Sequence, residues 1–186
     1  MIVLRDIRPE DKEMIHRWRN LPEVAEYMYT DHHITLQEHE RWFQRIQNDP
    51  TCRYWIITCD QEEVGLVNLY AIDQSSRRCY WAFYVASPNV RGKGVGSFTE
   101  YSILRYVFGE LNFNRLCCEV LSFNEAIINM HKGFGFIQEG YLRQHVIKGG
   151  RPMDVVSLAM LREEWYARKP EIEERMRTKG FLQEAT

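Results

Sequence analysis

Apolar and polar residues along the chain follow two kinds of pattern. Runs rich in aromatic and β-branched residues, which favour strands, occupy residues 53–59, 64–72, 78–85 and 116–121. Short polar segments separate the first three runs and favour antiparallel hairpins. Another short strand is predicted at residues 2–5. Two further strand patterns flank Gly149-Gly150, a dipeptide typical of a hairpin turn.

Helical patterns lie between these strands. Pro9 opens a helix that runs to about Asn20, and a short helical turn is predicted at residues 23–27. Thr35 and Glu38 form a capping box, in which each side chain satisfies a free amide at a helix start. The helices that we expect after these are at residues 36–48, 95–111 and 124–133.

The end of the chain is charged. The stretch after Leu161 predicts a solvated helix interrupted by Pro170, and its last residues are expected to fray. We therefore expect a domain at residues 1–165 and a charged helical tail at residues 166–186. The order of elements predicts an α+β domain with a mixed central sheet of about seven strands flanked by helices.

Composition narrows the function classes. The net charge is −2, so nothing favours nucleic acid or an anionic membrane as a partner, and no apolar run approaches the ~20 residues that span a bilayer. The five cysteines show neither a disulfide framework nor a zinc spacing. We expect no metal, reduced thiols and a cytoplasmic protein. The sequence leaves the oligomeric state open, with a homodimer among the options.

One glycine-rich segment carries candidate chemistry. Arg91-Gly92-Lys93-Gly94-Val95-Gly96 follows a strand pattern and opens a helical one. Glycines let the backbone approach an anion closely, and the amides of a helix start point at it. The spacing matches neither a Walker loop nor the dinucleotide-binding Gly-x-Gly-x-x-Gly. We predict a pyrophosphate site here, the alternative being a plain turn and helix cap.

This segment and a second motif together resemble the GNAT superfamily of acetyl-CoA-dependent N-acyltransferases. The second motif starts at Asn124-Glu125-Ala126-Ile127 and continues through Lys132-Gly133-Phe134-Gly135-Phe136 to Glu139-Gly140. The resemblance covers about residues 2–162 and implies an acyl-CoA N-acyltransferase fold that binds acetyl-CoA. The residues that it places at the cofactor are Phe83, Tyr84, Val85, Arg91, Gly92, Lys93, Gly94, Val95, Gly96, Ser97, Asn124, Asn129 and Lys132.

The first third of the chain is similar to one family within that superfamily. The shared positions are Arg19-Asn20-Leu21-Pro22, Tyr27-Met28-Tyr29, His39 and Trp42, with a one-residue length difference before Ile34. That family N-acetylates UDP-4-amino-4,6-dideoxy-N-acetyl-β-L-altrosamine in pseudaminic acid biosynthesis, which feeds glycosylation of flagellin or surface polysaccharide. The resemblance implies a nucleotide-sugar substrate. Alternatives are acetylation of a protein N-terminus or a polyamine, and a non-catalytic acyl-CoA-binding module.

Strand alternation places polar groups together independently of the resemblance. Asn68 and Tyr70 share one face of a strand, as do Tyr80 and Tyr84 of the next, and Glu119 lies on the same type of face. Such a cluster in central strands favours a binding site over tyrosines that merely pack under helices. The predicted substrate contacts are Arg19, Met28, Tyr29, His39, Trp42, Tyr70, Tyr80 and Glu119.

The candidate catalytic residues are His131, Glu119, Asn68 and Tyr84. Glu119 can bind the amine or relay its proton, unless it is paired with Arg115 or another base. The superfamily commonly has a Tyr five positions before the Phe of its Gly-Phe pair, as the acid for the leaving thiolate. His131 stands there, and an imidazole can also donate a proton. The alternatives are that His131 only lines the thiol channel, with water or Tyr84 supplying the proton.

Overall fold

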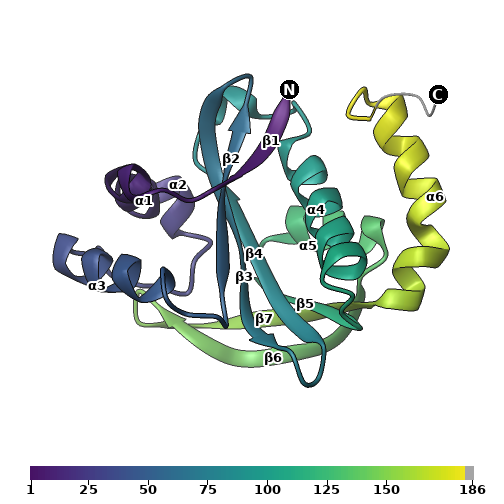
Figure 1. Ribbon diagram of the computed structural model, residues 1–186. Helices are drawn as coiled ribbons and strands as arrows, with labels where there is room; N and C mark the ends of the chain where they lie inside the picture. The colour runs from purple at the N-terminus through teal and green to yellow at the C-terminus, as the bar shows by residue number, and fades with distance from the viewer. Residues whose placement is uncertain (183–186) are drawn as a thin grey trace.

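A computed structural model describes residues 1–182 and contains a seven-stranded sheet in the order β1-β2-β3-β4-β5-β7-β6 (Figure 1). Strands β4 and β5 are parallel, and the other neighbours are antiparallel. The strands are β1 (Ile2–Asp6), β2 (Arg53–Cys59), β3 (Glu62–Asp73), β4 (Arg78–Val85), β5 (Arg115–Leu121), β6 (Ile137–Lys148) and β7 (Arg151–Leu161). The predicted α+β class and mixed sheet are confirmed.

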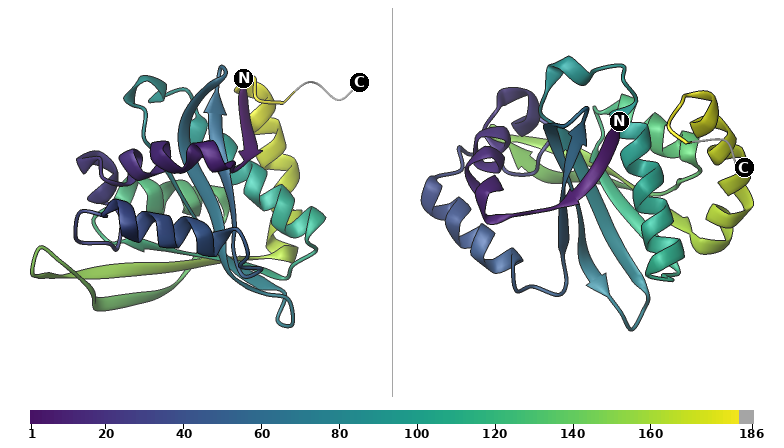
Figure 2. Two further views of the ribbon diagram at one scale, coloured as in Figure 1. Left: turned by 60° about the vertical axis from the view of Figure 1, so that its left-hand side comes forward. Right: turned by 45° about the horizontal axis from the view of Figure 1, so that its top comes forward.

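Helices cover both faces of the sheet. One group is α1 (Lys12–Arg19), α2 (Pro22–Ala25) and α3 (Leu36–Ile46), and the other is α4 (Val95–Arg105), α5 (Glu125–Phe134) and α6 (Arg162–Thr178). Figure 2 shows the two groups on opposite sides of the strands. Each group encloses its own apolar cluster, one around Phe43, Ile56 and Leu66, the other around Trp81, Leu104 and Trp165.

The turns follow the chemistry of their residues. Gly149 and Gly150 both have positive φ and join β6 to β7 in the predicted hairpin. Asp60 and Gln61 also have positive φ and form a two-residue turn. Strand β3 therefore starts at Glu62, two residues before the prediction, because the exposed side chains of Glu62 and Glu63 do not prevent their backbone from pairing with β2.

Helix α6 differs from the prediction at Pro170. The helix continues through this residue, so the expected interruption is wrong. Pro170 is exposed, where water can satisfy the carbonyl that loses its amide partner. Burial of Trp165, Ile172 and Met176 in the core with α4 residues offsets the lost hydrogen bond. The expected fraying of the final residues concerns 183–186, which lie outside the described part of the chain.

The sheet opens between β4 and β5. These strands pair only from Arg78–Arg115 to Tyr80–Cys117, and the later residues of β4 remain paired with β3 alone. Opposite this free edge, Gly65 of β3 faces the Tyr84 carbonyl so closely that a Cβ at residue 65 would collide with it. The backbone groups of Trp81 to Val85 that point away from β3 thus have no strand partner and can bind a ligand in the gap between β4 and β5.

Candidate active site

The glycine-rich loop forms the predicted strand-loop-helix junction. Gly92 and Gly94 have φ of 78° and 75°, in the left-handed region, and Gly94 is the N-cap of α4. The amides of the first helical turn, beginning at Val95, therefore lack partners within the helix. Arg91 and Lys93 are exposed on the loop. This geometry suits a pyrophosphate, because it combines free amides, a helix N-terminus and positive charge.

The loop, β4 and α5 meet at Gly96. A Cβ placed on Gly96 would lie 3.4 Å from Met130 Sδ and 3.5 Å from the Phe83 ring. Phe83 in turn stacks on Trp81, with ring centroids 5.5 Å apart. Gly94 lies against a different neighbour, Phe181, which follows α6. A Cβ added at Gly94 would collide with the Phe181 ring. The end of the described chain thus packs on the loop.

A cavity of about 420 Å³ lies on the side of the sheet covered by α1–α3. Seven of the predicted site residues line it, drawn from α1, the segment after α2, α3, β3 and β4. They are Arg19, Met28, His39, Trp42, Asn68, Phe83 and Tyr84. The strand-alternation prediction is confirmed for Asn68 and Tyr84, which point to the same face. We call this cavity the acceptor pocket.

The charged groups of the acceptor pocket differ in how far they are already satisfied. Arg19 donates to Thr30 Oγ1 at 3.1 Å and forms no ion pair with a carboxylate of residues 1–182. Glu38 is bound by the Thr35 amide and hydroxyl and by His32, which lower its pKa to about 2. His39 is buried and donates from Nε2 to the Lys12 carbonyl at 2.7 Å, so it ties α3 to α1 while lining the pocket.

Tyr84 brings an unsatisfied hydroxyl to the acceptor pocket. Its side chain is 8% exposed, and its oxygen has no partner among the described residues. Burial raises the pKa of Tyr84, so the phenol stays protonated. A buried hydroxyl without a partner is unfavourable unless a ligand supplies one. Tyr84 is therefore suited to bind a polar group of the acceptor.

Beside the acceptor pocket lies a cluster formed by Glu119, Tyr29, Tyr70 and Tyr80. The Tyr29 hydroxyl donates to Glu119 at 2.8 Å, and the rings of Tyr70 and Tyr80 lie 5.4 Å apart. Burial, followed by the nearby Glu119 charge, raises the pKa of Tyr29 and Tyr70. The alternative that Glu119 pairs with Arg115 is wrong, because Arg115 binds the Glu139 carboxylate through both terminal nitrogens.

The segment that carries Met28 and Tyr29 is fastened to the distant β6–β7 turn. Lys148 Nζ donates to three carbonyls, those of Ala25, Met28 and Thr30, at 3.1, 2.5 and 3.2 Å. Asp31 accepts from the Gly149 amide through both of its oxygens, at 2.7 and 2.8 Å. In the left view of Figure 2 this long hairpin extends beneath α1–α3. No local sequence pattern marks Lys148, so its role was not predicted.

His131 is a residue of α5, on the other side of the sheet, and its side chain faces α4. It is 3% exposed, and its Nδ1 lies 2.9 Å from Oε1 of the fully buried Glu100. Trp81 of β4 and Phe136 contact the ring at centroid distances of 5.2 and 5.4 Å. His131 thus packs against Trp81, the first residue of β4 beyond its pairing with β5, on the face opposite the acceptor pocket. Glu100 was not singled out in the sequence.

The remaining predicted cofactor residues lie on or before α5. Asn124 is the N-cap of α5 without a side-chain hydrogen bond, while Asn129 and Lys132 are exposed. Lys132 donates to Gln138 at 2.9 Å. The α5 residue that meets the loop and β4 is Met130, which lies beside Gly96 and Phe83. Contact of Asn124, Asn129 and Lys132 with the cofactor stays a prediction.

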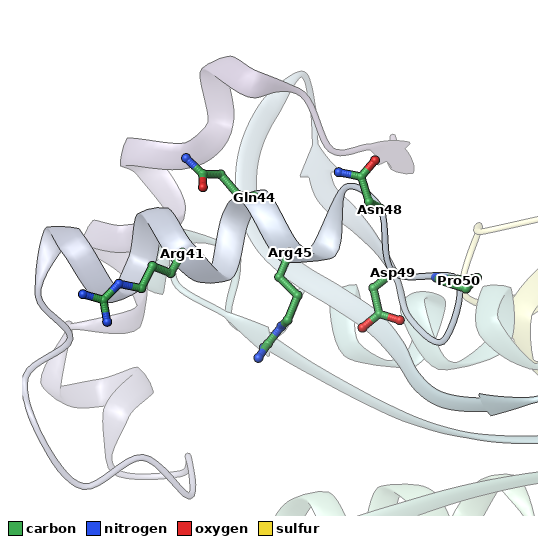
Figure 3. A pocket seen from close by; sticks show the side chains of 6 residues that line it. All are labelled: Arg41, Gln44, Arg45, Asn48, Asp49 and Pro50. Carbon is green, nitrogen blue, oxygen red and sulfur yellow. The ribbon is translucent and has the colours of Figure 1, made fainter.

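A second hollow lies on the outer face of α3, lined by Arg41, Gln44, Arg45, Asn48, Asp49 and Pro50 (Figure 3). The labelled side chains point in different directions and do not converge. None of the predicted site residues lines this hollow, so the acceptor pocket is the candidate active site. Within residues 1–182, no helix is both long and apolar enough to cross a bilayer, and no three potential ligands among His, Cys, Asp and Glu gather as a metal site.

Comparison with known proteins agrees with this geometry. The model of the acetyltransferase (GNAT) domain matches residues 2–137. Acetyltransferase PseH of Campylobacter jejuni is 27% identical over 127 residues, covering 68% of this chain and 77% of that protein. Spermidine N(1)-acetyltransferase of Escherichia coli K12 is 25% identical over 166 residues, covering 89% of each.

The fold is also that of solved structures. Spermidine N-acetyltransferase from Vibrio cholerae in complex with CoA and spermine superposes with a TM-score of 0.82 at 23% identity, over 89% of this chain and 98% of that one. The domain model spans well over half of the chain, and the glycine-rich loop and opened sheet lie within the matched residues. The chain therefore belongs to the GNAT acetyltransferase family.

Proposed function

We propose that this acetyltransferase moves the acetyl group of acetyl-CoA to the 4-amino group of a UDP-linked 4-amino-4,6-dideoxy sugar. The observation that carries the proposal is the charge of the acceptor pocket. Arg19 pairs with no carboxylate of residues 1–182, while Glu38, which lines the pocket, is already bound by Thr35 and His32. An arginine matches the geometry of a diphosphate, whereas a polycation favours unpaired carboxylates.

The other lining groups fit a sugar. Trp42 offers an aromatic face, and Met28 offers apolar surface for a 6-deoxy methyl group. Asn68 can hydrogen-bond ring substituents, and so can the Tyr84 hydroxyl, which has no partner in the described part of the chain. The resemblance of Arg19, Tyr29, His39 and Trp42 to the altrosamine N-acetyltransferase pattern supports the same substrate class.

The mechanism assigns each face of the sheet a task. The free edge of β4 presents a backbone amide to the thioester oxygen, and the amides of the glycine-rich loop bind the pyrophosphate of acetyl-CoA. Glu119, held by Tyr29, accepts the proton of the attacking amine through water. His131 approaches from the opposite face and protonates the departing thiolate. The acetyl group thus passes to the amine at the β4–β5 opening.

A polyamine is the second candidate acceptor. Its support is the similarity to spermidine acetyltransferases, which extends over 89% of this chain, against 68% for the Campylobacter protein. Glu119 is the group on the acceptor face that best fits an ammonium. Family membership favours either acceptor over a non-catalytic acyl-CoA-binding module.

An acceptor panel tests the proposal. CoA release is followed with a thiol reagent for a UDP-4-amino-4,6-dideoxy sugar, spermidine and an N-terminal peptide, and the products are identified by mass spectrometry. We expect turnover with the nucleotide sugar. Arg19→Met should raise the KM for that substrate at least tenfold, because a charged hydrogen bond contributes about 1.5–3 kcal/mol. Selective acetylation of spermidine by the wild-type protein would reject the assignment.

A further inference from the structure

A pair of ionisable side chains is buried on the face opposite the acceptor pocket. Glu100 of α4 is 0% exposed, and His131 of α5 is 3% exposed. Their hydrogen bond joins Oε1 to Nδ1 at 2.9 Å, while Oε2 of Glu100 has no partner among the described residues. A half-satisfied carboxylate in an apolar environment is costly when ionised, so its presence calls for a role beyond packing.

The surroundings of the pair are mostly apolar. Trp81 of β4 and Phe136 pack against the imidazole. The charged or titratable groups that face the pair from other elements are Arg175 of α6 and the Cys118 thiol of β5. Arg175 donates to the Gly133 carbonyl and lies over the Phe134 ring, and burial keeps the pKa of Cys118 well above its usual value.

We propose that Glu100 is a positioning residue for His131, and that together they form a dyad that keeps a proton on Nε2 for the leaving thiolate. This inference rests on the proposed role of His131 as the acid, but it does not depend on which amine is the acceptor. Nδ1 is engaged by Glu100, and Nε2 has no hydrogen-bond partner among residues 1–182. The carboxylate thus fixes both the ring orientation and the nitrogen that faces away from it.

The proton count of the step is balanced. Before transfer the dyad holds two protons, one shared between Oε1 and Nδ1 and one on Nε2. As the carbon–nitrogen bond forms and the carbon–sulfur bond breaks, the sulfur takes the Nε2 proton and leaves as a thiol. The dyad keeps the shared proton and regains the other from solvent, while the amine proton leaves through the acceptor side.

The burial of Glu100 favours the protonated dyad. Desolvation raises the pKa of the Glu100 carboxyl, against the opposing effect of His131 and Arg175. A dyad that lost its second proton would leave a net negative charge among Trp81, Phe136 and Cys118. Burial of the pair therefore opposes the loss of the transferable proton.

Glu100→Gln tests the inference, with Thr99→Val as the matched control. Thr99 is the preceding residue of α4 and is fully buried, and its hydroxyl has no partner within residues 1–182. Its near-isosteric replacement therefore perturbs the same helix without touching the dyad. The kcat is measured from pH 6 to 10 for both variants and the wild type, with any amine that the wild type acetylates. In Glu100→Gln the alkaline limb should move about one to three units toward acid, with the KM for acetyl-CoA unchanged within about twofold.

Two outcomes would overturn the inference. One is an unchanged pH profile in Glu100→Gln. The other is a uniform loss of kcat at every pH, which would mean a structural role only. Nitrogen NMR of His131 in the wild-type protein gives an answer without any acceptor or variant. The proposal expects Nε2 to be protonated at pH 7.5, and an unprotonated Nε2 there would contradict it. Failure of the nucleotide-sugar assignment leaves both measurements intact.

Discussion

Replacing Lys148 by Met removes the ammonium that holds the acceptor segment to the β6–β7 turn. The ammonium binds the carbonyls of Ala25, Met28 and Thr30. Ala25 is the last residue of α2, and Met28 and Thr30 flank Tyr29. Hydrogen bonds to a charged group contribute about 1.5–3 kcal/mol each when buried, but these carbonyls can be rehydrated in the variant. We expect a net loss of about 2 kcal/mol in the local stability of the segment.

That loss should appear in acceptor binding. About 2 kcal/mol corresponds to a roughly 30-fold shift between ordered and open states of the segment, so the acceptor KM should rise between about 3- and 30-fold. The dissociation constant of acetyl-CoA should not change, because the glycine-rich loop lies on the other side of the sheet. Amide exchange at Met28, which bonds to the Ala25 carbonyl at 3.1 Å, should accelerate.

The assay is steady-state thiol release at saturating acetyl-CoA, combined with hydrogen exchange by mass spectrometry. Lys169→Met on α6 is the matched control, because its ammonium lies 3.8 Å from Glu173, on a helix of the opposite layer. An acceptor KM within twofold of the wild type, with unchanged exchange at residues 25–30, would refute the role of Lys148. An equal loss of acetyl-CoA affinity would point to general unfolding.

Three further predictions follow from other contacts. Gly94→Val should weaken acetyl-CoA binding by calorimetry, and adding Phe181→Ala should not restore it if the loop binds the pyrophosphate; full restoration would show that only the collision with Phe181 matters. His131→Phe should lower kcat by ~10²- to 10⁴-fold with little change in the KM for acetyl-CoA, His131→Tyr should recover part, and a wild-type kcat in the Phe variant would exclude the acid role. Burial acts to raise the pKa of Asp11, but hydrogen bonds from Arg5 and the Arg8 amide outweigh it and hold this pKa below its usual value. The stabilisation is therefore present above pH ~4 and is lost as the pH falls through the lower pKa of the folded state. Urea unfolding of Asp11→Asn should show a lower free energy of unfolding than the wild type at pH 7, and this difference should shrink below pH ~4. A difference that does not depend on pH would contradict this.

Local sequence signals predicted most of the fold. Strands with aromatic and β-branched residues, the capping box at Thr35 and the glycines at 149–150 each determine their structure within a few residues. The alternation of strand faces also holds, since Tyr70 pairs with Tyr80 across β3 and β4. The predicted interruption at Pro170 was wrong because the proline removes one hydrogen bond locally, whereas the packing that offsets this loss involves a helix distant in the sequence.

The parts of the site that sequence did not reveal depend on contacts between distant residues. Lys148 binds carbonyls 118 to 123 positions away, and Glu100 meets His131 across 31 positions. Gly65 did carry a signal, because an isolated glycine inside a strand pattern marks a close backbone approach. Glu100 carried none, since a single carboxylate in a helix is usually solvated.

A competition experiment tests the central claim most directly. Equal concentrations of a UDP-4-amino-4,6-dideoxy sugar and spermidine are incubated with the protein and limiting acetyl-CoA, and both acetylated products are quantified by mass spectrometry. Their ratio gives the ratio of the two kcat/KM values. The charge of the acceptor pocket predicts at least about a tenfold excess of the acetylated nucleotide sugar, equal to about 1.4 kcal/mol. An excess of acetylspermidine would contradict the account.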